Sequence, residues 1–119
     1  MNRITYEERA KVYGQALDSF GTVTQLVVGI EELSEIQKEI CKALRGEDNL
    51  QHLAEEVADA TIMLEQLRLI FDINEEVGGI MDEKVERLRE NIKKAKAENQ
   101  ERPHHGKRRK TRRPTHAEI

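Results

Sequence analysis

Four carboxylates stand out in the sequence because they occur as two pairs, each with a spacing of three residues. The first pair is Glu32 and Glu35, and the second is Glu56 and Asp59. Residues three apart lie on the same face of an α-helix, so each pair would present two acids side by side. Carboxylates that close repel one another unless they are protonated or share a cation. Oxygen ligands suit hard cations, so the pattern predicts a site for Mg²⁺, with Mn²⁺ as the alternative.

The segment between the two pairs predicts a tight turn that brings them together. The helix that carries the first pair is expected to end at Gly46, and Asn49 is a suitable N-cap for the next helix. Helices joined by so short a connection pack antiparallel. At 1.5 Å per residue, the first pair lies about 17 Å from the turn and the second about 12 Å. Helix stagger can absorb this difference, so all four acids are predicted to converge on one site.

This pattern resembles the signature of the all-α nucleoside triphosphate pyrophosphohydrolases of the MazG-like group. The resemblance rests on Glu31-Glu32-x-x-Glu35, a gap of 20 residues and Glu56-x-x-Asp59, and it extends over about residues 20–92. It implies a four-helix bundle with an antiparallel central hairpin, working as a homodimer or homotetramer. It also implies that water attacks the α-phosphorus of a nucleoside triphosphate, giving a nucleoside monophosphate and pyrophosphate.

The acids have several expected roles. Glu32, Glu35, Glu56 and Asp59 are predicted metal ligands, against the simpler interpretation that they are charged flanks of a helical hairpin. A carboxylate that does not bind the metal, Glu31 or Glu35, would act as the general base. Glu31 could equally be a ligand or face solvent. Nearby, Glu39 is expected to be an exposed helix residue.

Candidate substrate contacts come from two other regions. Lys84, Arg87 and Asn91 share one face of the last expected helix, and the resemblance implies that Lys84, then Arg87 or Asn91, binds the triphosphate. The alternative is an ordinary charged helix surface. Gln25, nearly two helical turns before the acids, could read a base edge or bind a phosphate, or simply be exposed.

The apolar residues recur every three or four positions, and no stretch alternates with a period of two, which predicts an all-α fold. A capping box, Thr5 with Glu8, should begin the first helix, and Thr22 is a suitable N-cap for the second. The expected helices span about 6–20, 22–45, 50–71 and 75–96. The residues predicted to form buried stripes on the first three are Ala10, Tyr13, Leu17, Phe20, Leu26, Ile30, Leu33, Ile40, Leu44, Leu53, Val57, Ala60, Leu64, Leu67 and Phe71.

Charge divides the chain into two parts. Residues 1–100 hold 13 basic and 21 acidic residues, a balance of −8, whereas residues 101–119 hold 7 and 2, a balance of +5; together these give the net −3. We therefore expect one helical domain over residues 1–100 and a basic, disordered tail over 101–119.

The lone Cys41 cannot form an internal disulfide, and no signal peptide or membrane span is visible, so a cytoplasmic protein is expected. Two other functions compete with hydrolysis. One is a non-catalytic helical interaction module whose acids only keep it soluble. The other is a weak nucleic-acid binder that contacts phosphates through the segment from Lys107 to Arg113.

Overall fold

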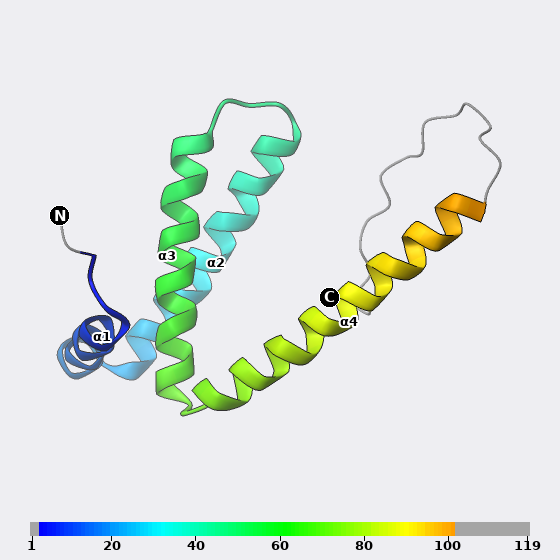
Figure 1. The fold of residues 1–119 in the computed structure, drawn as a ribbon. Helices are drawn as coiled ribbons and strands as arrows, with labels where there is room; N and C mark the ends of the chain where they lie inside the picture. The colour runs from blue at the N-terminus through cyan, green and yellow to red at the C-terminus, as the bar shows by residue number, and fades with distance from the viewer. Residues whose placement is uncertain (1–2, 102–119) are drawn as a thin grey trace. The chain divides into compact units, whose positions relative to one another are not determined.

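The computed structural model describes residues 3–101, which form four α-helices (Figure 1). Their bounds are Tyr6–Phe20 for α1, Thr22–Leu44 for α2, Leu50–Ile70 for α3 and Asn74–Glu101 for α4. The all-α prediction is confirmed for this part of the chain, and α4 runs five residues further than expected. The chain divides into two compact units, one with α1, α2 and α3 and one with α4, and each is described by itself. Apart from Glu101, the predicted basic tail lies outside the described residues.

Local signals set the beginning and end of α1. The Thr5 hydroxyl accepts from the backbone N–H of Glu8 at 3.2 Å, and the Glu8 carboxylate accepts from the backbone N–H of Thr5 at 2.8 Å. This is the predicted capping box. The helix ends at Gly21, where a φ of +86° suits glycine and the N–H donates to the Leu17 carbonyl. The prediction that Thr22 caps α2 is wrong, because Gly21 is the N-cap and Thr22 is already helical.

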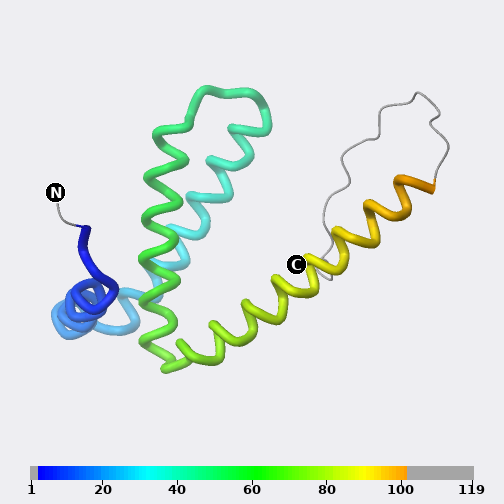
Figure 2. Tube along the Cα trace, in the orientation of Figure 1, coloured from blue at the N-terminus to red at the C-terminus, as the bar shows by residue number. Residues whose placement is uncertain are grey.

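A polar contact near the turn ties α2 to α3, which run antiparallel as predicted (Figure 2). The side chain of Asn49 does not cap α3; its Nδ2 donates to the backbone carbonyl and a carboxylate oxygen of Glu39, at 2.9 and 2.7 Å. Lys42 donates to the other carboxylate oxygen at 3.1 Å. The expectation that Glu39 is exposed is therefore wrong. These hydrogen bonds, Asn49's first, lower the pKa of the buried Glu39 carboxyl.

A second polar cluster fastens α1 to α3. The Nε and Nη2 atoms of Arg9 donate to the two carboxylate oxygens of Glu65, both at 3.0 Å, and the buried Tyr13 hydroxyl donates to the same carboxylate. The Arg9 bonds are the main reason that the pKa of Glu65 is lowered. Burial, followed by the contact with Glu65, raises the pKa of Tyr13 to about 12. The ionised Glu65 with neutral Tyr13 is thus the favoured state at neutral pH.

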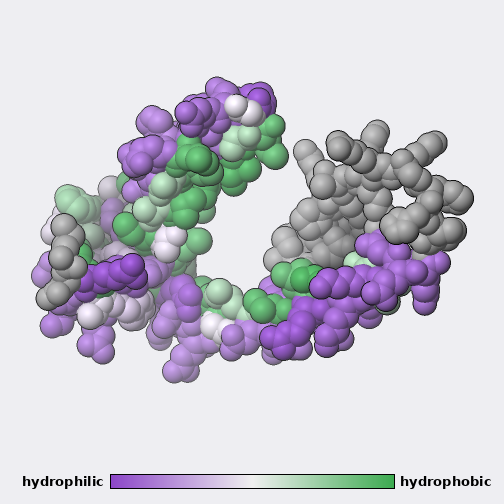
Figure 3. Space-filling view, turned by 45° about the horizontal axis from the view of Figure 1, so that its top comes forward, coloured by the Kyte–Doolittle hydropathy of each residue, from purple (hydrophilic) through white to green (hydrophobic). Residues whose placement is uncertain are grey.

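Few of the apolar residues that were predicted to form buried stripes are buried in the single chain. Within residues 3–101, the buried hydrophobic residues are Tyr13 and Ala60, whereas Ile30 is 69% and Leu44 80% exposed. The other residues predicted as buried but found exposed are Phe20, Ile40, Val57, Leu64 and Phe71. The buried residues of the two hairpin helices are Gly29 and Glu39 on α2 and Ala60 and Gln66 on α3. Large apolar side chains of the hairpin lie at the surface, where Figure 3 shows broad apolar patches.

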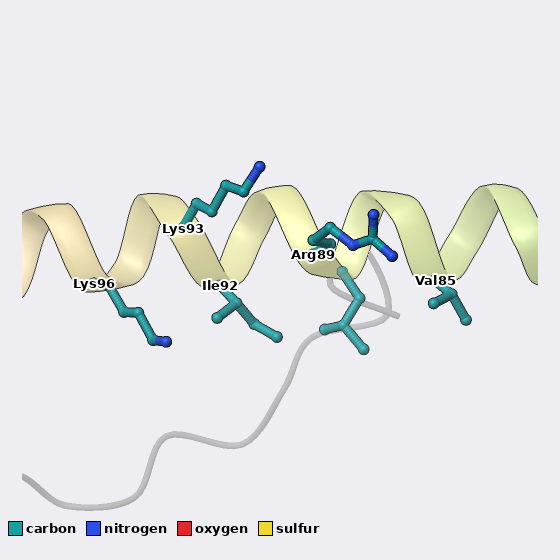
Figure 4. Close-up of a pocket in the computed structure, with 6 residues that line it drawn as sticks. Val85, Arg89, Ile92, Lys93 and Lys96 are labelled. Atoms are coloured by element: carbon teal, nitrogen blue, oxygen red, sulfur yellow. The ribbon is translucent and has the colours of Figure 1, made fainter.

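Helix α4 is amphipathic and continuous through Gly78 and Gly79. Val85 and Ile92 project from one side of the helix, and Lys93 projects from the opposite side (Figure 4). Ile80, Met81, Val85, Leu88 and Ile92 are all exposed. Taken by itself, α4 thus carries a stripe of large apolar side chains.

The contact between α1 and α3 predicts a pH-dependent loss of stability in a Glu65 variant. Glu65→Ala should lower the free energy of unfolding by about 1 to 3 kcal/mol at pH 7, because Arg9 and Tyr13 lose a largely buried acceptor. Since the folded state lowers the pKa of Glu65, its stabilisation is complete above the usual value of 4.5 and is lost as the pH falls through the lowered pKa.

Urea unfolding of wild type and variant between pH 7 and pH 3 measures this difference directly. The two curves of stability against pH should run parallel above about pH 5 and converge below it. The exposed acid Glu55 of the same helix provides the control, since Glu55→Ala should change stability little at any pH. A Glu65 difference that stays constant down to pH 3 would contradict the assignment.

Candidate metal site on the helical hairpin

Three of the four predicted metal ligands come together on the hairpin. Helix α2 supplies Glu32, and α3 supplies Glu56 and Asp59. One carboxylate oxygen from each residue lies within 4.8 Å of the others. Glu56 and Asp59 meet because residues three apart share a helix face, and Glu32 meets them because the turn sets the register of α2 against α3. Glu32 and Glu56 are half-buried, and Asp59 is exposed.

The electrostatics of this acidic cluster are unfavourable for three free carboxylates. Burial, followed by the charges of Asp59 and Glu56, raises the pKa of Glu32. The Oε2 atom of Glu56 is buried and has no hydrogen-bond partner among the described residues. No salt bridge in residues 3–101 joins any of the three to a basic side chain. A bound cation would relieve both the repulsion and the unsatisfied oxygen.

The dimensions of the cluster fit a small divalent cation. Mg²⁺ binds oxygen at about 2.0 to 2.1 Å, so two ligands on opposite sides of the ion are about 4.2 Å apart. One oxygen of each acid lies within 4.8 Å of the others, and an oxygen-only donor set would suit Mg²⁺ or Mn²⁺.

Two other acids lie beside the cluster without joining it. The Glu35 carboxylate accepts from Lys38 at 3.1 Å, and about half of its side chain is exposed. Its negative charge contributes to the raised pKa of Glu32, although less than the other acids do. Glu31 is exposed. The roles of Glu35 as a fourth ligand, and of Glu31 or Glu35 as the base, therefore stay predictions.

The predicted phosphate-binding residues share a face of α4. Lys84 and Arg87 are exposed and Asn91 is half-buried. Neither Lys84 nor Arg87 forms a salt bridge within residues 3–101, whereas the neighbouring Arg89 and Lys93 are paired with Glu86 and Glu90. Binding of the triphosphate by Lys84, Arg87 or Asn91 stays a prediction.

Gln25 is held by a hydrogen bond between α2 and α3. It is half-buried, and its Nε2 donates to Oε1 of Gln66 at 2.9 Å. Sequence reasoning missed Gln66, together with Gly29 and Met63, which approach each other between the helices. A signal was present in the spacing: Gln25 precedes Glu32 by seven residues and Gln66 follows Asp59 by seven, so each lies two turns from an acid on the same face.

Comparison with known proteins adds no assignment. No family model matches the sequence, and no characterised protein or solved structure matches it at a significant level. None of the helices within residues 3–101 combines the length and apolar character required to span a bilayer.

Proposed function

We propose that this chain is a Mg²⁺-dependent nucleoside triphosphate pyrophosphohydrolase. The observation that carries the proposal is the acidic cluster itself, in which Glu32, Glu56 and Asp59 from two facing helices place their oxygens within 4.8 Å. An acidic helix surface that served only solubility would spread its charges over solvent, because crowding raises their energy. The buried, unsatisfied Oε2 of Glu56 points to the same conclusion.

The reaction follows from what such a site can bind. When present, Mg²⁺ neutralises the charge of the phosphate oxygens and favours an in-line displacement. Glu32, Glu56 and Asp59 would hold the ion, and Glu35 or Glu31 would accept the proton of the attacking water. The water oxygen bonds to the α-phosphorus while the bond from that phosphorus to the bridging oxygen breaks. The products are a nucleoside monophosphate and pyrophosphate, and Lys84 with Arg87 or Asn91 would bind the triphosphate.

The proposal predicts loss of turnover when any of the three clustered acids is made neutral. Glu32→Gln, Glu56→Gln and Asp59→Asn should each lower kcat/KM at least about a hundredfold, since the metal contributes several kcal/mol to the barrier reduction. Helicity should be unchanged. Glu55→Gln is the matched control, because Glu55 is the sequence neighbour of Glu56 but is exposed and outside the cluster. Pyrophosphate release from the common ribo- and deoxyribonucleoside triphosphates with Mg²⁺ is the assay.

Water labelled with ¹⁸O identifies the phosphorus that is attacked. Attack at the α-phosphorus places the label in the nucleoside monophosphate, and attack at the β-phosphorus would place it in pyrophosphate. Wild-type rates in all three cluster variants, or no release from any nucleotide by the wild type, would refute the proposed function and favour the interaction-module alternative.

Self-association is part of the same proposal. Val27, Ile30 and Leu64 on the hairpin are between 48% and 69% exposed, which is unusual for large apolar residues of a stable monomer. A second copy of the chain, in a homodimer or homotetramer, would cover them. The burial of apolar area at such an interface would supply stability that the small core of a single chain lacks.

Light scattering at micromolar concentration tests the association. The mass should be two or four times the 13.8 kDa of the chain. Val27→Glu, on the hairpin, should lower the mass toward that of the monomer, because a charge buried at the interface is costly. Val12→Glu, which makes the same change at an exposed position of α1, should leave the mass unchanged. An active monomeric wild type would disprove this part of the proposal.

A further inference from the structure

An apolar pocket of about 260 Å³ lies between α2 and α3, next to the acidic cluster. On α2 it is lined by Gly29, three residues before Glu32, and on α3 by Met63, four residues after Asp59. One helical turn, about 5.4 Å, therefore separates this lining from the acids along each helix. Gly29 is buried, and a Cβ atom built on it would lie 3.8 Å from the sulfur of Met63. A side chain at position 29 would therefore occupy part of the pocket.

The polar groups of the pocket are two amides. Gln25 and Gln66 both line it, and Gln25 Nε2 donates to Gln66 Oε1 at 2.9 Å. Gln66 is only 5% exposed, so its amide is fixed within the hairpin. Each amide has two N–H donors and a carbonyl with two lone pairs, and their mutual hydrogen bond uses one of each. The pair can therefore offer a donor and an acceptor to a ligand.

We propose that this pocket binds the base of the nucleotide substrate, with its edge recognised by Gln25 and Gln66. The inference rests on the proposed function, because it takes the acidic cluster as the place of the phosphates. A nucleobase has two apolar faces, which the walls formed by residues such as Leu33 and Leu67 would cover. Its edge carries neighbouring donors and acceptors, which a glutamine amide matches with two hydrogen bonds.

The distance between the amides and the acids supports this orientation. Gln25 lies seven residues from Glu32 and Gln66 seven from Asp59, or about 10.5 Å along each helix. That separation corresponds to the reach of a nucleotide from its α-phosphate to the far edge of its base. Because a buried amide left unpaired by the wrong base costs more than a missing apolar contact, the pocket should discriminate between bases.

Gly29→Ala is the sharpest test of the pocket. The new methyl group would meet Met63 at an ordinary contact distance, and alanine favours the helix, so the thermal midpoint should stay the same or rise. The methyl also occupies space that the base needs. The KM for the best nucleotide should therefore rise roughly tenfold, with kcat changed far less. Gly14→Ala in α1 is the matched control, since nothing lies within 4 Å of its added Cβ.

Gln25→Leu tests recognition of the base edge by a residue that is only half-buried. The ratio of kcat/KM between the best and the worst of the common nucleoside triphosphates should fall at least tenfold in this variant. In the wild type, ribose 5-triphosphate, which has no base, should have a KM well above that of the best nucleotide. Both results would support binding of the base in the pocket.

The outcomes separate this inference from the proposed function. Hydrolysis by wild type with equal KM values for the Gly29→Ala and Gly14→Ala proteins would overturn the base pocket and leave the pyrophosphohydrolase intact. A lower assembly mass for Gly29→Ala, in place of a higher KM, would also overturn it, because the pocket would then be a contact between copies. Failure of the wild type to release pyrophosphate from any nucleotide would overturn both proposals.

Discussion

The repulsion between three carboxylates, held together by the packing of α2 against α3, is the constraint on which the site depends. The negative charges of Glu32, Glu56 and Asp59 repel one another at this distance. Burial, followed by the charges of the other two acids, raises the pKa of Glu32. The hairpin opposes this repulsion through contacts elsewhere, among them the buried hydrogen bonds between Asn49 and Glu39 near the turn. The fold thus holds the three carboxylates closer together than their charges favour, and either a proton on Glu32 or a bound cation would lower that repulsion.

Two small residues, Gly29 and Ala60, are buried between the helices of the hairpin. Gly29 lies beside Met63, and Ala60 directly follows Asp59 in the chain. An apolar pocket lies beside the acidic cluster, and larger apolar side chains of the hairpin lie at the surface. We propose that a base fills the pocket and that a second copy of the chain covers the exposed apolar side chains.

Local patterns in the sequence were sufficient to predict the helices and most of the acidic cluster. The capping box of Thr5 and Glu8 and the three-residue spacing of Glu56 and Asp59 depend only on helix geometry, which is why both are found as predicted. Contacts between helices were harder, because periodicity marks an apolar face without naming its neighbour. Ile30 was accordingly predicted to be buried and is exposed in the single chain.

The hydrogen-bond partners of polar side chains were equally hard to predict, because residues distant in the sequence become neighbours only in the tertiary structure. Asn49 is the N-cap residue of α3 as predicted, but its side chain binds Glu39, ten residues earlier, and makes no capping hydrogen bond to its own helix. Glu65 gave no sequence signal at all, because its partners Arg9 and Tyr13 lie more than fifty residues away. Gln66 could have been recognised from its seven-residue distance to Asp59, once Gln25 had been found at the same distance from Glu32.

The most direct test of the central claim is where a divalent cation binds. Mn²⁺ is paramagnetic and broadens the amide resonances nearest to it, so substoichiometric Mn²⁺ added to ¹⁵N-labelled protein would map the site. The account predicts that signals around Glu32 and from Glu56 to Asp59 broaden first, that excess Mg²⁺ restores them, and that Glu56→Gln but not Glu55→Gln abolishes the effect. Diffuse broadening over acidic segments such as Glu75–Glu76, with no preference for the cluster, would contradict it.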